Sequence, residues 1–257
     1  MHSKPMKVIR NREIAKDTYE LILSGELVQH LHEAGTFLHV RVPEENFVLR
    51  RPLSLAAVNH ELGTCTIIYK RVGDGTERIT SARPNDRLDV LGPLGGSTFP
   101  VSLPKNADRI LLVGGGVGIP PIYFAARQLT ERGIPVSIIA GYADKESVFY
   151  EKAFYELPHS DVTIVTDDGS HGEKGTVIDI LKKQPAADWL FACGPRGMLR
   201  ALKEEVPDET NCYVSLEEHM GCGIGACYAC ICESSDRRSY FKVCQDGPVF
   251  RAEEVYL

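Results

Sequence analysis

The sequence lacks the features that would tie it to a membrane or to a nucleic acid. None of its apolar runs approaches the ~20 residues needed to span a bilayer, and Met1–Pro5 opens no apolar stretch typical of a signal peptide. The formal net charge is only −6, with acidic and basic side chains interleaved throughout, which argues against a nucleic-acid or anionic-membrane surface. Internal repeats and low-complexity segments are also missing. We therefore expect a cytoplasmic protein whose partners are small ligands and other proteins.

The chain has eight histidines, but none of them form a pair with metal-ligand spacing. His219 is interpreted as a neighbour of a metal site rather than a ligand. The eight cysteines are distributed unevenly, because Cys65, Cys193 and Cys212 stand alone while five crowd the C-terminal segment. A disulfide framework suits a small secreted domain, whereas a cysteine cluster in an intracellular chain indicates metal. The isolated Cys65 and Cys212 are expected to be small buried apolar residues.

The first hundred residues predict an antiparallel β-barrel. Short β-type runs such as 37–42 and 64–69 are separated by glycine, proline and Asn-His turns, and evenly spaced short strands are typical of a barrel. With 257 residues, the chain has room for two compact domains and a small appendage.

From Arg109 the pattern changes to apolar strand, glycine turn and amphipathic helix, which predicts an open, mostly parallel sheet. The first unit has a strand at 110–113, a turn at 114–118 and a helix through 122–129 that stops near Gly133, with two prolines in its first turn. Further strands are expected at 136–140, 162–165 and 189–192, and further helices at 177–181 and 198–202. The pattern breaks after Pro207. The resulting division is 1–100 (barrel), 101–209 (nucleotide-binding α/β domain) and 210–257 (small cysteine-rich domain).

The strongest chemical signal is a four-cysteine pattern, C-x4-C-x2-C followed later by a fourth cysteine. Its members are Cys222, Cys227, Cys230 and Cys244. This spacing matches the plant-type [2Fe-2S] loop, and the glycines between the cysteines supply bare N–H groups and positive φ angles for a loop wrapped around a cluster. The alternative is a zinc site with four cysteine ligands, although zinc sites favour C-x2-C pairs. Cys232 is left out because Cys227 and Cys230 already satisfy the tight spacing.

A glycine-rich turn lies between the first apolar strand and its helix. It contains Gly114, Gly115, Gly116 and Gly118. Such a turn can cradle a pyrophosphate against the helix N-terminus, although its spacing is not the common G-x-G-x-x-G and glycine runs also form plain tight turns.

Three weaker motifs complete the set. Arg51–Ser54 offers a guanidinium for a phosphate and a hydroxyl for a flavin ring nitrogen. Gly73–Thr76 either contributes to the same ligand site as Arg51–Ser54 or is a simple hairpin turn. Cys193–Pro195 ends a predicted strand, where open α/β sheets bind ligands, or is a strand-ending turn with a core thiol.

The order of these motifs resembles the ferredoxin–NADP reductase superfamily and, within it, the family of electron-transfer subunits of NAD-dependent (class 1B) dihydroorotate dehydrogenases. The resemblance covers nearly the whole chain, and its most specific feature is a ferredoxin-like cysteine loop placed after the nucleotide domain. It implies an FAD site, an NAD site and a [2Fe-2S] cluster bound by the four cysteines named above. The FAD residues would be Arg51, Pro52, Leu53, Ser54, Ile68, Tyr69, Lys70, Gly75 and Thr76. The NAD residues would be Gly114, Gly115, Gly116, Gly118, Cys193, Gly194 and Pro195, with Cys193 near the nicotinamide.

The resemblance also implies a division of labour in de novo UMP synthesis. Dihydroorotate would be oxidised at an FMN on a partner subunit, and electrons would pass through this chain's cluster and FAD to NAD, in a heterotetramer of two copies of each subunit. No catalytic side chain is expected beyond the electron relay. Related subunits serve hydrogenases, sulfite reductases and NADH-dependent ferredoxin reductases, and these stay open as alternatives, as does a zinc-bearing interaction module without redox activity.

Acidic side chains after the second strand of the nucleotide domain predict NAD rather than NADP. Asp144 and Glu146 would repel a 2′-phosphate, whereas Lys145 between them is ambiguous. Asp167 and Asp168 form either a turn or a ribose contact.

Overall fold

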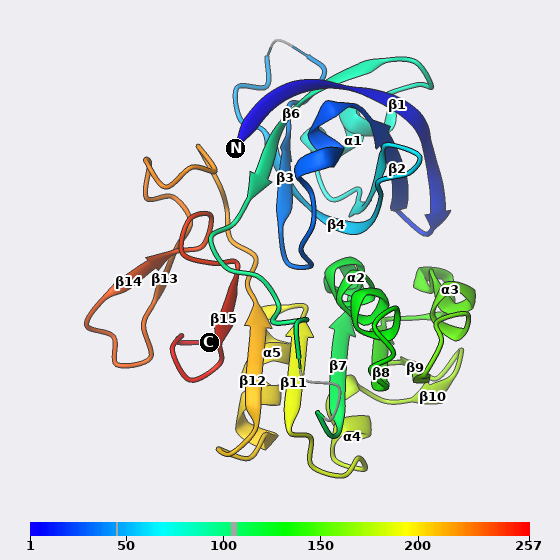
Figure 1. The fold of residues 1–257 in the computed structure, drawn as a ribbon, viewed down its shortest axis with the longest axis vertical. Helices are drawn as coiled ribbons and strands as arrows, with labels where there is room; N and C mark the ends of the chain where they lie inside the picture. Colours follow the sequence, from blue (N-terminus) through cyan, green and yellow to red (C-terminus); the bar gives the residue numbers. More distant parts are fainter. Residues whose placement is uncertain (45, 104–106) are drawn as a thin grey trace.

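The protein is described by a computed structural model that covers residues 1–44, 46–103 and 107–257. Its N-terminal part is a closed antiparallel barrel in the strand order β1-β2-β5-β4-β3-β6 (Figure 1). The elements are β1 (His2–Ala15), β2 (Thr18–Ser24), the 3-10 helix η1 (Glu26–His30), β3 (Phe37–Val40), β4 (Arg51–Asn59), β5 (Thr64–Lys70), α1 (Asp74–Thr80) and β6 (Arg87–Leu94). Buried side chains alternate along β6, as expected for a strand with one face in a barrel core. The predicted barrel is confirmed.

The second part is a seven-stranded sheet in the order β10-β9-β8-β7-β11-β12-β15. Its elements are β7 (Ile110–Gly115), η2 (Gly116–Gly118), α2 (Ile119–Thr130), β8 (Val136–Tyr142), η3 (Lys145–Ser147), α3 (Glu151–Tyr155), β9 (Ser160–Thr166), β10 (Glu173–Lys174), α4 (Val177–Leu181), β11 (Trp189–Cys193), α5 (Arg196–Glu205), β12 (Asn211–Ser215) and β15 (Val249–Arg251). All pairs are parallel except β12 with β15. All six residues of β7 are buried, which explains its unbroken apolar sequence.

The cysteine-rich segment lies beside both the barrel and the sheet (Figure 1). It contains the hairpin of β13 (Ile231–Glu233) and β14 (Tyr240–Lys242). The Gly247 carbonyl accepts hydrogen bonds from the N–H groups of Gly96 at 2.7 Å and Ser97 at 3.1 Å, in the link between barrel and sheet. The cysteine loop is thereby placed at the junction of the other two parts.

One alternative and one domain boundary from the sequence differ from the structure. Gly73–Thr76 is not a hairpin turn: it leads into α1, because Thr76 Oγ1 accepts the N–H groups of Val72 at 3.0 Å and Gly73 at 3.2 Å. Strands β12 and β15 fall within the expected cysteine-rich domain 210–257 but complete the nucleotide sheet. Along the described ranges, the helices are all too short or too polar to cross a membrane.

Candidate functional site

A cleft of about 550 Å³ opens between the barrel and the nucleotide sheet. Eight of the nine expected FAD residues line it, namely Arg51, Pro52, Leu53, Ser54, Ile68, Tyr69, Lys70 and Thr76. The sequence did not reveal its other walls, which are Phe37, Val72, Val117, Arg196, Ser215, Leu216, Glu217, Glu218, His219, Met220 and Pro248. The cleft therefore joins all three parts of the chain.

Arg51 is positioned by the glycine that opens α1. A Cβ atom on Gly75 would lie 2.3 Å from Arg51 Nε, so the guanidinium occupies the space that any larger residue would fill. Arg51 Nη1 donates to the Leu49 carbonyl at 2.7 Å. With Lys70 and Arg196 on the same cleft, the guanidinium supplies the positive charge that a phosphate-bearing ligand requires.

Tyr69 forms a rigid part of the cleft. Its ring stacks on Tyr19 with centroids 5.6 Å apart, and its hydroxyl donates to Asn11 Oδ1 at 3.1 Å. Burial raises the pKa of this phenol above its usual range, so it stays neutral at physiological pH. Only 2% of Tyr69 is exposed, so its ring packs into the barrel and supports the cleft from behind.

The two nucleotide motifs lie next to each other. Cys193 pairs with Gly114 across the parallel strands β11 and β7. A Cβ atom on Gly118 would lie 2.2 Å from the Cys193 carbonyl oxygen, and one on Gly194 would lie 3.3 Å from the Gly115 Cα. Only glycine permits this approach of two backbone turns at the carboxyl edge of the sheet, where such folds bind nucleotides.

The Cys193 thiol does not line the cleft. It is buried, with 1% of the residue exposed, and burial raises the pKa of the thiol, so it stays protonated. What Cys193–Pro195 presents to a ligand is therefore backbone. The assignment of this motif to the nicotinamide stays a prediction.

The expected NAD ribose region carries partnered acidic groups. Asp144 Oδ1 accepts the backbone N–H of Ser147 at 2.9 Å and its hydroxyl at 2.8 Å, and these bonds hold the pKa of the carboxyl below its usual value. Glu146 forms an ion pair with Lys16 at 3.5 Å. Asp168 makes a turn, accepting the N–H of Ser170 at 2.9 Å. Asp144 thus keeps a negative charge in the region expected to face the ribose of the nucleotide, which stays a prediction.

The four expected cluster cysteines converge, and backbone N–H groups point at their sulfurs. Gly225 donates to Cys244 Sγ at 3.1 Å, and Cys244 donates to Cys230 Sγ at 3.4 Å. Cys222 Sγ accepts the N–H groups of Ile224 at 3.4 Å and Ala226 at 3.3 Å, and the N–H of Cys222 itself donates to Cys227 Sγ at 3.3 Å. Amides aimed at sulfur stabilise thiolates, the form that binds iron.

The thiols form two pairs, Cys222 with Cys227 and Cys230 with Cys244. Burial opposes ionisation of Cys222, but the amides and the Cys227 thiol outweigh it and lower the pKa to about 7. Burial and the contact with Cys230 raise the pKa of Cys244. Within residues 1–44, 46–103 and 107–257, no three His, Cys, Asp or Glu side chains surround one point that could hold a single metal ion. Paired thiols fit a cluster of two irons with two thiolates each.

Cys232 stands apart from these pairs. It lies on β13, opposite Phe241 of β14, and burial raises the pKa of its thiol to about 11. Its side chain lies in the same apolar core as Cys230 and Cys244, but its thiol contacts the backbone of Phe241 rather than another cysteine. This placement supports leaving it out of the ligand set, which stays a prediction.

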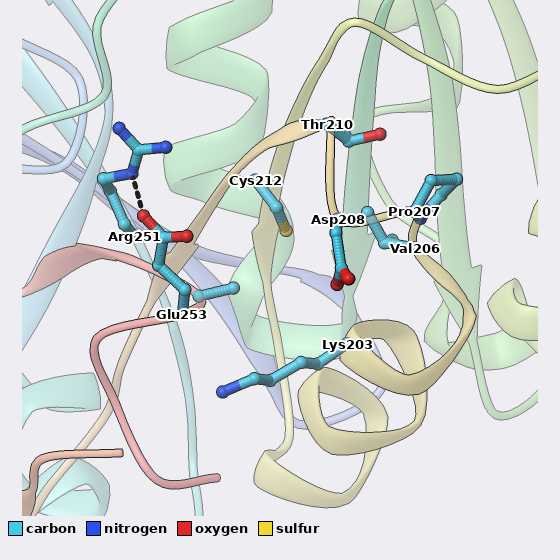
Figure 2. Close-up of a pocket in the computed structure, with 9 residues that line it drawn as sticks. Lys203, Val206, Pro207, Asp208, Thr210, Cys212, Arg251 and Glu253 are labelled. Atoms are coloured by element: carbon cyan, nitrogen blue, oxygen red, sulfur yellow. Dashed lines mark ion pairs between the residues drawn. The ribbon is translucent and has the colours of Figure 1, made fainter. Parts of the chain in front are cut away.

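A second cavity, of about 170 Å³, lies between α5, β12 and β15 (Figure 2). Three of its charged side chains have partners: Lys203 Nζ donates to the Val255 carbonyl at 3.0 Å, and Arg251 pairs with Glu253 at 2.9 Å. None of the expected site residues lines it. The cavity therefore marks where the C-terminal segment is tied to α5.

Comparison with known proteins supports two parts of this site. Residues 112–204 match the family described as the oxidoreductase NAD-binding domain. Residues 217–256 match the iron-sulfur cluster binding domain of dihydroorotate dehydrogenase B.

Structural likeness extends over the whole chain. The protein of a study on flavin-based electron bifurcation, the NADH-dependent reduced ferredoxin-NADP oxidoreductase, superimposes with a TM-score of 0.85 at 30% identity, covering 99% of this chain and 91% of that one. A cytochrome P450 reductase from Amycolatopsis shares the fold with a TM-score of 0.68 at 23% identity, covering 82% of this chain and 69% of that one.

The curated relatives include several proteins of one name, dihydroorotate dehydrogenase B (NAD(+)), electron transfer subunit. The Geobacillus sp. (strain WCH70) protein is 47% identical over 260 residues, covering 100% of both chains. That of Bacillus caldolyticus is 49% identical over 255 residues, covering 98% of both. Identity at this level along the full length confirms the resemblance found in the sequence motifs: the chain belongs to the family of electron transfer subunits of dihydroorotate dehydrogenase B.

Proposed function

We propose that this chain carries electrons from a dihydroorotate-oxidising partner subunit to NAD through a [2Fe-2S] cluster and FAD, in de novo UMP synthesis. The observation that carries the proposal is the junction of the three parts. Met220 lines the cleft, and the paired thiols begin two residues later at Cys222. The cleft and the cysteine loop are thus continuous in the chain, as an FAD site next to a cluster site requires.

The barrel residues that line the cleft would hold FAD, with Arg51 toward its phosphates and Ser54 near the flavin ring. The Gly114–Gly118 turn would hold the pyrophosphate of NAD, with the backbone of Cys193–Pro195 near the nicotinamide. Cys222, Cys227, Cys230 and Cys244 would bind the cluster. These roles follow the division into 1–100, 101–209 and 210–257, with β12 and β15 added to the nucleotide sheet.

Electron counting explains why one chain holds all three sites. Nicotinamide exchanges a two-electron hydride and a [2Fe-2S] cluster exchanges single electrons, and a bound flavin supplies the conversion between the two. The chain's own residues then position the groups. The barrel forms one wall of the cleft, where FAD would bind. The Gly114–Gly118 turn would bind the nucleotide at the opposite wall, and the cysteine loop lies next to the cleft.

The loop surface supports a protein partner. Cys227 is exposed, whereas Cys230 is buried with 3% exposure, so one thiol pair faces outward. Large apolar side chains surround it: Tyr228 is 62% exposed and Ile224 46%. Exposed apolar side chains near a one-electron carrier fit an interface with the next redox centre. We assign this surface to an FMN-bearing catalytic subunit, in a symmetric assembly of two copies of each subunit.

Other reductase subunits would use the same cofactors, and the NADH-dependent reduced ferredoxin-NADP oxidoreductase has a similar fold at 30% identity. The higher identity of the dihydroorotate dehydrogenase relatives, 45–49% over full length, favours that partner.

The proposal is tested by separating the two half-reactions. The purified chain, with FAD and iron restored, should reduce a dye with NADH but should not oxidise dihydroorotate, because that oxidation needs a flavin beside a positioned base. Adding the FMN subunit should restore dihydroorotate-dependent reduction of NAD. Orotate formed by the isolated chain would refute this division of labour, and the absence of restored activity would refute the choice of partner.

A further inference from the structure

His39 is a buried polar residue on the outer face of the barrel, because Leu38 and Val40 occupy the inner face of the same strand. It lies on β3, paired with Pro52 of β4 and Leu91 of β6, and none of its surface is exposed. Phe37, two residues earlier on the same face of β3, lines the cleft. The strand that forms one wall of the cleft therefore also presents an imidazole immediately beyond it.

Both ring nitrogens of His39 are buried and make no hydrogen bond of good geometry with a described residue, although the ring faces the backbone of Arg50 and of Cys222. Burying an unpaired donor or acceptor is unfavourable, and buried polar atoms in folded proteins nearly always have a partner. The ring therefore calls for a role in the loaded protein.

The cysteine loop lies directly against this ring. A Cβ atom on Gly223 would lie 2.5 Å from His39 Nδ1 and 3.0 Å from Cε1, and φ of Gly223 is +72°. The backbone of Cys222, the preceding residue, also contacts the ring. The edge that carries Nδ1 thus faces the Cys222–Gly223 peptide, and the missing side chain of Gly223 is what permits the contact.

We propose that His39 is a positioning residue for the iron-sulfur cluster: its Nδ1–H donates to the peptide between Cys222 and Gly223 once the loop has closed around the cluster. The bond ties the first cluster ligand to the strand that walls the FAD cleft, so one strand sets the position of both redox groups. This inference rests on the proposed ligand role of Cys222.

Three substitutions at position 39 separate this role from simple packing. His39→Leu fills the space without a polar atom. His39→Asn places an amide where Nδ1 lies, whereas His39→Gln places it nearer Nε2. If the Nδ1 bond holds the loop, His39→Leu and His39→Gln should release iron to a chelator about 10- to 100-fold faster than wild type, the usual effect of losing a partner that orients a metal ligand. His39→Asn should stay within about threefold of wild type.

The readouts are iron release from the oxidised holoprotein, the electron paramagnetic resonance spectrum of the reduced cluster, and flavin content. Flavin content should not change, and the spectrum should change in the Leu and Gln variants but not in the Asn variant. If His39 only fills space, His39→Leu will match wild type and His39→Asn will be the weakest, which would overturn the proposal. The Gln and Asn pair decides the question even if the Leu variant fails to fold.

Cys222→Ala distinguishes failure of this inference from failure of the cluster assignment. If Cys222→Ala keeps the [2Fe-2S] spectrum, the assignment is wrong. If it loses the spectrum while His39→Leu behaves as wild type, only the role of His39 is wrong.

Discussion

Gly75→Ala should weaken FAD binding without unfolding the barrel. The new Cβ would lie 2.3 Å from Arg51 Nε and 2.4 Å from Nη2, both at the end of a flexible side chain. The guanidinium can move away by about 1 Å to reach an ordinary van der Waals distance from the new Cβ. A shift of this size is large enough to misalign its hydrogen bond to a flavin phosphate. Gly75 itself lies in the first turn of α1 and has no positive φ, so alanine adds no backbone strain.

The expected loss follows from the bond that Arg51 would make to a flavin phosphate. A hydrogen bond to a charged group contributes about 1.5–3 kcal/mol, which corresponds to a roughly 10- to 150-fold weaker affinity. Gly73→Ala is the matched control, because a Cβ there meets nothing within 4 Å and Gly73 is extended, with φ of −171°. Flavin fluorescence quenching on titration of the flavin-free protein measures both affinities.

A double-mutant cycle makes the test specific to Arg51. Arg51→Ala alone should lose a similar amount of affinity, and adding Gly75→Ala to it should change nothing further, because the displaced group is already gone. Wild-type affinity in Gly75→Ala, or an equal loss in Gly73→Ala, would refute the reasoning.

Three further predictions concern the cluster and the nucleotide. Replacing Cys222, Cys227, Cys230 or Cys244 with Ala should abolish the [2Fe-2S] absorption while FAD stays bound, whereas Cys232→Ala should keep it; iron lost from the Cys232 variant but kept in a Cys230 variant would reverse the assignment. Gly118→Ala should raise the Kd for NADH, because its Cβ would lie 2.2 Å from the Cys193 carbonyl oxygen and a backbone atom cannot move aside as a side chain can. Gly197→Ala is the control, because a Cβ at that position on α5 meets nothing within 4 Å, and it should bind NADH as wild type in the same titration. NADH should exceed NADPH in kcat/KM for dye reduction, because the ionised Asp144 would repel a 2′-phosphate; equal values would contradict this.

The sequence signals for the site come from segments that are local in the chain. The cysteine spacing carried its own chemistry, and the glycine turn was found because strand, turn and helix follow one another within twenty residues. The predicted barrel and parallel sheet are confirmed, because their individual strands and helices each leave a local pattern in the sequence. The residues missed are those brought together by packing of distant segments: Phe37, Arg196 and Pro248 share one cleft although they lie on β3, on α5 and beside β15.

His39 illustrates the same limit from another direction. In the sequence it is a histidine within an apolar strand, and nothing there shows that the loop at Gly223, almost two hundred positions away, packs against its ring. Likewise the alternation of strands ended at β11 in the sequence, whereas the sheet continues through β12 and takes β15 in antiparallel direction from beyond the cysteine loop. Short strands that pair at long range leave little periodic signal.

The central claim is that electrons pass between NAD and the cluster only through the flavin cleft. The most direct measurement is reduction of the cluster by NADH, followed by electron paramagnetic resonance, in the isolated chain with its FAD removed and then restored. The flavin-free protein should give no reduced-cluster signal with NADH although dithionite produces one, and adding FAD should restore reduction by NADH. Reduction of the cluster by NADH at the same rate with and without FAD would contradict the account.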